Sequence, residues 1–133
     1  MPFVLDSSAA LARAAPDEAL AQSVRRLLET DTMVAPALWP FETVNGLEMM
    51  RRRGRLDAQA LADALEVLRL LPIEIESQDF ERSANAILPL AQQYGLTVYD
   101  AAYLELAKRR RLPLATLDEG LRRAARKARV KVI

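Results

Sequence analysis

Apolar residues in this chain form short blocks that alternate with longer stretches of helical spacing. The blocks at 3–5, 33–35, 73–76, 114–115 and 130–133 predict short strands. Apolar positions that recur every three or four residues predict helices over 8–13, 16–28, 38–53, 57–68, 80–94, 100–111 and 117–128. Strands that alternate with helices predict an α/β fold, a three-layer α/β/α sandwich around a mostly parallel sheet of four to five short strands.

Glycine, proline and aspartate mark the boundaries of several predicted helices. Gly54 and Gly95 stand where helices should end, and Asp57 stands where an N-cap is needed. Pro89 lies inside the stretch 80–94, so we expect a kink or a break in that helix. With no linker or repeat between these elements, residues 1–133 are expected to form a single domain.

Four carboxylates occupy the positions where a parallel sheet would bind a ligand. Asp6 directly follows the first predicted strand, and Asp118 lies shortly after the fourth. Asp100 opens one predicted helix, and Glu42 lies near the start of another. If the first and fourth strands are neighbours, their carboxyl ends form a crevice that the two helix starts can reach.

Such a cluster needs protons or a cation. At a spacing of roughly 5 Å, each pair of ionised carboxylates would repel by about 3 kcal/mol at an effective dielectric near 20. A divalent cation offsets this repulsion, and a ligand set made only of oxygen points to Mg²⁺ or Mn²⁺. The sequence therefore predicts a metal-dependent phosphodiesterase.

Each acid also has a structural explanation. Asp6, Asp100 and Asp118 could each be a helix N-cap, and Thr116 with Glu119 fits a capping box. Glu42 shares a helix face with Asn45, which could orient the carboxylate, or both groups could simply face solvent at the edge of the core.

Other polar and aromatic residues near the acids have two explanations as well. Ser7 and Ser8 could bond the Asp6 carboxylate, although capping of the first helix is the simpler role. Tyr99 and Tyr103 flank Asp100 and are expected to pack in the core and not to stack on bases. The cations that could contact RNA, or could equally be solvated helix ends, are Arg51, Arg53, Lys108, Arg109 and Arg110.

Composition removes several classes of mechanism. The chain has no Cys and no His, which excludes disulfides, thiolate catalysis, a Ser-His-Asp triad and histidine-dependent cleavage of RNA. No targeting segment or run of about 18 apolar residues is present, so we expect a cytoplasmic protein that does not enter a membrane. The net charge of +1 hides a gradient, because residues 56–100 hold eight acids and two bases whereas residues 101–133 hold ten bases and three acids.

Four segments together resemble the PIN domains, specifically the VapC-type toxins of toxin–antitoxin systems. They are residues 4–9 (VLDSSA), 41–45 (FETVN), 96–107 (LTVYDAAYLELA) and 114–118 (LATLD), and the YDAAY block is the most specific. The resemblance implies a Mg²⁺- or Mn²⁺-dependent endoribonuclease, held inactive by a VapB-type antitoxin and usually a homodimer. It assigns the acidic quartet to Asp6, Glu42, Asp100 and Asp118, with Asn45 and Thr116 in support.

Two other functions remain open at this stage. In an aspartyl-phosphate phosphotransferase Asp6 would be the nucleophile, but such sites place a second Asp two residues on, where this chain has Ser8. A catalytically silent PIN-like scaffold that binds RNA or a protein is the alternative from a different class. The complete set of four acids favours the ribonuclease.

Overall fold

A parallel sheet of four short strands forms the centre of the computed structural model, which describes residues 1–15, 25–26, 29 and 31–133. The strands lie in the order β3-β2-β1-β4. Their bounds are β1 Phe3–Leu5, β2 Met33–Pro36, β3 Ile73–Glu76 and β4 Leu114–Ala115. Val4 in β1 is in register with Val34 on one side and Leu114 on the other. The first and fourth predicted strands are therefore neighbours, which is the condition on which the predicted crevice depends.

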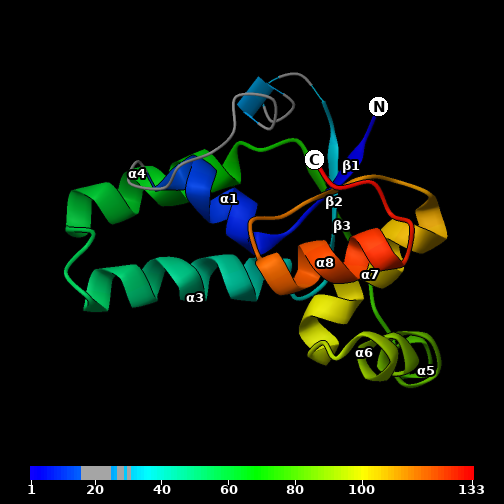
Figure 1. The fold of residues 1–133 in the computed structure, drawn as a ribbon. Helices are drawn as coiled ribbons and strands as arrows, with labels where there is room; N and C mark the ends of the chain where they lie inside the picture. The colour runs from blue at the N-terminus through cyan, green and yellow to red at the C-terminus, as the bar shows by residue number, and fades with distance from the viewer. Residues whose placement is uncertain (16–24, 27–28, 30) are drawn as a thin grey trace.

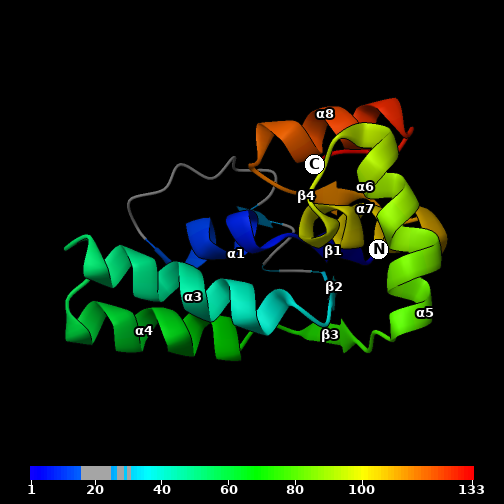
Figure 2. The same cartoon turned by 90° about the horizontal axis from the view of Figure 1, so that it is seen from below.

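Helices cover both faces of this sheet (Figures 1 and 2). Helices α1, α3 and α4 gather on one side, and helices α5 to α8 gather on the other. Their bounds are α1 Ser7–Ala14, α3 Trp39–Arg52, α4 Ala58–Arg69, α5 Phe80–Arg82, α6 Leu88–Tyr94, α7 Val98–Arg110 and α8 Glu119–Lys127. The predicted three-layer α/β/α sandwich is confirmed. The helix predicted over 16–28 lies almost wholly outside the described residues.

Helix α7 is the most buried helix of the structure and packs directly on the sheet. Every residue from Ala101 to Ala107 is buried, including Tyr103 and Glu105. A helix that is apolar on nearly all sides is expected only where neighbours surround it, and α7 contacts β1, β2, β4, α6 and α8. None of the helices that the structure describes is long and apolar enough to cross a membrane.

Most helix ends follow the signals in the sequence. Asp57 caps α4 by accepting a hydrogen bond from the Ala60 N–H at 2.8 Å. Gly54 and Gly95 have φ values of 74° and 65°, which glycine adopts without steric penalty. The irregularity expected at Pro89 is a π-helical turn, Ser83–Ile87, between α5 and α6.

Three local predictions are wrong. Helix α7 begins at Val98 and its N-cap is Thr97, so Asp100 lies in the first turn and does not cap. Thr116 is not the cap of α8, because Asp118 is, accepting a hydrogen bond from the Leu121 N–H. The strand predicted over 130–133 is reduced to one bridge, between Leu114 and Val132. In the first two cases a nearby residue with a better-placed oxygen takes the cap.

Helices α1 and α3 approach closely at Gly46. A Cβ atom at this position would lie 3.3 Å from Cγ of Leu11 and 3.1 Å from its Cδ2, and it would clash with Cδ1. A side chain at 46 would therefore press against the Leu11 side chain of α1.

We predict that Gly46→Ala lowers the melting temperature in the wild-type background, because overpacking costs about 1–3 kcal/mol. In a Leu11→Ala background the same substitution should raise it, since the space is free and Ala exceeds Gly in helix propensity by about 1 kcal/mol. Thermal unfolding of the four proteins of this cycle measures the coupling. A destabilising effect of equal size in both backgrounds would contradict the proposed contact.

Candidate active site

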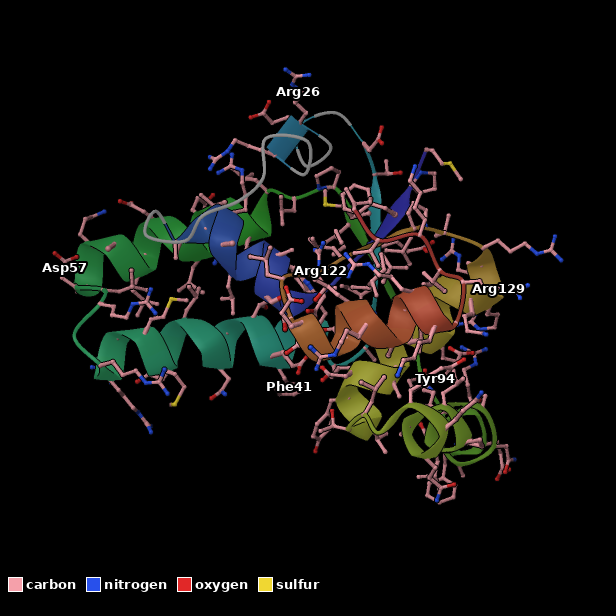
Figure 3. The ribbon with its side chains drawn as sticks, viewed as in Figure 1. Arg26, Phe41, Asp57, Tyr94, Arg122 and Arg129 are labelled. Atoms are coloured by element: carbon pink, nitrogen blue, oxygen red, sulfur yellow. The ribbon has the colours of Figure 1, made fainter. Side chains whose placement is uncertain are left out.

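The four carboxylates lie around the carboxyl ends of strands β1, β2 and β4. Asp6 follows β1 immediately and Asp118 follows β4 after two residues. Glu42 lies in the first turn of α3, the helix that follows β2, and Asp100 lies in the first turn of α7. The exposed side chain of Phe41, beside Glu42, marks the start of α3 in Figure 3.

Asp6 is the most buried of the four carboxylates, with only 3% of its surface exposed. Ser8 and Thr116 each donate a hydroxyl hydrogen bond of 2.6 Å to its Oδ2 atom. Burial raises the pKa of the Asp6 carboxyl, and these two hydrogen bonds oppose the rise because they favour the charged form. Oδ1 receives a contact of 3.5 Å from the Ser7 hydroxyl. One oxygen of Asp6 is thus firmly held while the other has a weaker donor.

The same two hydroxyls fix the loop between β4 and α8. The Leu117 N–H donates to the Ser8 hydroxyl oxygen at 2.9 Å, and the Asp118 N–H donates to the Thr116 hydroxyl oxygen at 3.1 Å. Asp118 then accepts a 2.7 Å hydrogen bond from the Leu121 N–H through its Oδ1 atom. Each hydroxyl therefore joins Asp6 to the loop that positions Asp118.

Tyr103 holds Glu42 in place across the site. Its hydroxyl donates a hydrogen bond of 2.6 Å to Oε1 of Glu42, and the Tyr103 side chain itself is fully buried. Burial raises the pKa of Glu42, the Tyr103 hydrogen bond lowers it, and the charge of Asp6 raises it. A fixed phenol thus orients a half-buried carboxylate.

The other three acids all affect the pKa of the Asp100 carboxyl. Burial is the largest cause that raises the pKa of its carboxyl to about 6. The negative charges of Asp6, Asp118 and Glu42 act in the same direction. The fold therefore places carboxylates from four separate segments close enough to repel one another, and no cation is among the causes of the pKa shift.

The carboxylates interact electrostatically but do not already form a metal-binding site. In residues 1–15, 25–26, 29 and 31–133, no three acidic side chains converge closely enough to hold a metal ion. The site nevertheless consists of oxygen donors that repel one another, three of them wholly or partly buried, which is the chemistry that binds hard divalent cations. Protonation of Asp100 and binding of a cation are the two ways to relieve this repulsion.

The predicted supporting residues differ in where they lie. Thr116 is buried against Asp6, and a Ser7 hydrogen bond lowers the pKa of Glu42, so both are at the site. Asn45 is exposed and lines a surface depression with Phe41 and Glu48.

Most of the predicted RNA-binding cations are already paired within the protein. Arg109 bonds Glu105 and Glu76, and Arg110 bonds Glu74. Arg51 bonds Glu48 in the same helix. Lys108 and Arg53 form no ion pair with the residues that the structure describes. The basic run at the end of α7 is therefore partly neutralised by the edge strand β3.

Sequence reasoning misjudged three side chains. Ser8 bonds the Asp6 carboxylate and the β4–α8 loop, where capping had been thought simpler. Tyr103 packs as expected but also reaches Glu42, 61 residues away, and no local pattern signals that contact. Tyr99 was expected to pack, yet 65% of its surface is exposed.

Comparison with known proteins places these residues in context. The family model described as PIN domain matches residues 3–127. Ribonuclease VapC3 of Pyrobaculum aerophilum is 31% identical over 121 residues, which cover 91% of this chain and 92% of that protein. Ribonuclease VapC3 of Mycobacterium tuberculosis is 33% identical over 123 residues, which cover 91% and 85%. The crystal structure of PAE2754 from Pyrobaculum aerophilum superposes with a TM-score of 0.71 at 26% identity, covering 93% of this chain and 79% of that one.

We predict that the metal-free protein loses stability as the pH rises from about 4 to about 7. The folded-state pKa of Asp100, about 6, lies above the ordinary value of 3.8. The stability that its proton contributes is therefore present at low pH and lost as the pH rises through the folded-state value. Asp100→Asn should flatten this dependence and raise the free energy of unfolding at pH 7.5 by on the order of 1 kcal/mol, after allowance for solvent screening.

Chemical denaturation between pH 4 and 8 in EDTA measures the effect. Asp63→Asn is the matched control, since Asp63 is an exposed carboxylate on α4 that bonds Gln59. The control should keep the wild-type pH profile. An Asp100→Asn profile parallel to that of wild type would show that Asp100 does not carry the uncompensated charge.

Proposed function

This chain belongs to the PIN domain family, and on that basis we propose that it is a Mg²⁺- or Mn²⁺-dependent endoribonuclease, the toxin of a VapBC-type toxin–antitoxin pair in the cytoplasm. The observation that carries the proposal is the coupling of four carboxylates from separate segments, expressed in the raised pKa of Asp100. The two relatives named ribonuclease VapC3 support the choice of RNA as substrate.

The donor set fits a hard divalent cation. In this proposal Asp6 and Asp100 are the principal ligands, and Glu42 and Asp118 complete the shell directly or through water. All four offer oxygen only, and the charges that act on Asp100 are all negative. When bound, Mg²⁺ or Mn²⁺ would activate water as a Lewis acid and neutralise charge on the in-line transition state of phosphodiester hydrolysis.

The surrounding residues have defined tasks in this proposal. Ser8 and Thr116 donate hydrogen bonds to the Oδ2 atom of Asp6. The Oδ1 atom has the weaker contact from the Ser7 hydroxyl, so it stays available to a ligand. Tyr103 keeps Glu42 oriented and, by donating a hydrogen bond, favours its charged form. With neither His nor Cys present, proton transfer to or from water falls to these carboxylates. The expected products carry a 5′-phosphate and a 3′-hydroxyl.

RNA contacts outside the acidic site would come from cations that form no ion pair with the described residues. Such cations lie at the carboxyl ends of α3 and α7, whereas the carboxylates lie in the first turns of these helices. Of the five predicted from sequence, Arg53 and Lys108 are the better candidates. Arg51, Arg109 and Arg110 would first have to leave carboxylate partners within the protein. Exposed ion pairs of this kind are weak, about 0–1 kcal/mol each, so RNA could displace some of them.

Catalysis should depend wholly on metal. EDTA should abolish cleavage of a structured RNA, and Mg²⁺ or Mn²⁺ should restore it, whereas Ca²⁺ should support little turnover because its looser geometry positions water and phosphate poorly. Asp6→Asn and Asp100→Asn should each reduce the rate constant at least about 10³-fold, and the double variant should be no slower, because the site acts as a unit.

Asp63→Asn serves again as the control and should cleave at the wild-type rate, since Asp63 is exposed on α4. Gel analysis of end-labelled RNA follows the reaction and identifies the new ends. Cleavage that survives EDTA, or an Asp100→Asn protein that cuts as fast as wild type, would contradict a metal-dependent ribonuclease at these carboxylates.

Two kinds of association complete the proposal. Exposed apolar side chains support a homodimer, since a monomer that leaves them in water forgoes burial of a large apolar area; among them are Phe41, Val44, Phe80 and Tyr99. A VapB-type antitoxin is the second proposed partner. A basic side chain of the antitoxin would pair with Asp6 and Asp100, because a guanidinium matches carboxylate geometry and can occupy the place of a cation.

Both associations can be measured together. Light scattering at micromolar concentration should give twice the monomer mass, and Phe41→Ser with Phe80→Ser should shift it toward the monomer without loss of the fold, since both side chains are about 80% exposed. The antitoxin encoded beside this chain should co-purify with it and suppress RNA cleavage. A strictly monomeric wild-type protein, or an antitoxin complex that cuts RNA at full rate, would contradict the respective association.

A further inference from the structure

A second polar site lies at the opposite edge of the sheet. A pocket of about 550 Å³ opens beside Met1, which precedes β1, and Pro113, which precedes β4. Because these strands are parallel, their amino ends share one edge and the acidic site occupies the other. Five residues of extended chain separate Met1 from Asp6, so the two sites are roughly 16 Å apart along β1.

Four exposed cations line this pocket and no acid does. They are Lys108, Arg111, Arg129 and Lys131. Figure 3 shows Arg129 beyond the carboxyl end of α8, away from Phe41 at the acidic site. Within the described ranges none of the four forms an ion pair, whereas the adjacent Arg109 and Arg110 both do. The amino group of Met1 forms an ion pair with Oδ1 of Asp31 at 3.5 Å.

The ends of two helices do not account for this charge. Helices α7 and α8 both end at the pocket, and each helix carboxyl end carries the equivalent of about half a negative charge. Two ends therefore offset about one of the four positive charges and leave about three. The excess suits a ligand with several negative charges.

The backbone conformation at the pocket is a second, independent indication that a ligand binds here. Arg111 and Arg129 have φ values of 55° and 62°, the two positive values among the described residues other than glycine. Helices α3 and α6 end in the same left-handed conformation but use Gly54 and Gly95 there. A residue with a Cβ atom costs about 1–2 kcal/mol in this conformation, so arginine is a poor choice for the turn itself. At both helix ends beside the pocket, and at neither of the other two, the chain carries a guanidinium in place of glycine.

We propose that this pocket binds phosphate groups of the RNA, several nucleotides away from the bond that is cleaved. The inference rests on the proposed ribonuclease function and extends it, because it gives the enzyme a second contact with the sugar–phosphate backbone. The guanidinium group of arginine can donate two parallel hydrogen bonds to phosphate oxygens, and the ammonium group of lysine adds a compact positive charge. Contacts of this kind set affinity and register and carry no base specificity.

Arg111 and Arg129, the two arginines with a left-handed backbone conformation, allow a specific test of this proposal. Arg111→Gly combined with Arg129→Gly removes two positive charges and also relieves backbone strain, so the variant should fold with an unchanged or higher melting temperature. Arg52→Gln with Arg69→Gln is the matched control, because it removes two exposed positive charges away from the pocket that are paired within their own helices, Arg52 to Glu48 in α3 and Arg69 to Glu66 in α4.

RNA binding is measured by fluorescence anisotropy in an Asp100→Asn background, so that the RNA stays intact. Each phosphate contact to a single strand contributes about 0.7 to the slope of log affinity against log salt. The glycine pair should therefore lower that slope by about 1.4 and weaken binding of a 20-nucleotide RNA about tenfold near 150 mM salt, and the control pair should change neither. In the catalytic background the same pair should raise KM for that RNA.

Three other results would overturn either the inference or the proposed function. If wild type cleaves RNA but the glycine pair binds it with the affinity and salt slope of the control, the pocket does not bind RNA and the inference is overturned. Loss of binding to polyglutamate with RNA binding intact would assign the pocket to an acidic polypeptide, which also overturns it. If wild type neither binds nor cleaves RNA, the proposed function itself fails.

Discussion

Burial of several like charges at one edge of a small sheet is the constraint on which this structure depends. Asp6 is almost fully buried, and its carboxylate accepts hydrogen bonds from hydroxyl groups, while no base in the described part of the chain forms an ion pair with it. The same hydroxyls accept N–H groups of the β4–α8 loop, so the charge that they stabilise also fixes the loop. A site built in this way is costly without a proton or a cation, and that cost is the source of its affinity for either.

Helix α7 connects this acidic site to the rest of the molecule. Its first turn carries Asp100, its buried middle carries Tyr103, and its last turns carry Glu105 and Arg109. Tyr103 bonds Glu42, and Arg109 bonds both Glu105 and Glu76 of the edge strand β3. Charged side chains along an edge strand also discourage pairing with another chain. One helix therefore orients a carboxylate through Tyr103 and forms ion pairs with the edge strand through its last turn.

A parallel sheet separates charge in this protein because its strands all run in one direction, while α7 and α8 run back from the carboxyl ends of the strands to their amino ends. Glu42 and Asp100 lie in first turns, where the positive end of a helix dipole favours a carboxylate. Arg111 and Arg129 lie just beyond the carboxyl ends of α7 and α8, where a cation is favoured. The net charge of +1 is thus the sum of two opposed edges. An RNA that touches both would be held at the basic edge and cut at the acidic one.

Local sequence was sufficient for the order of most elements, because strand length, helical spacing and capping residues act over a few positions, and it singled out four acids that the fold places near one another. Asp57, Gly54 and Gly95 behave as their neighbours in the chain predict. The tertiary structure alone decided which polar groups meet. The hydrogen bond from Tyr103 to Glu42 and that from Thr116 to Asp6 span 61 and 110 residues. Contacts at such separation depend on how layers stack, which no periodicity encodes, and the same is true of the four cations that the fold gathers at the amino ends of the strands.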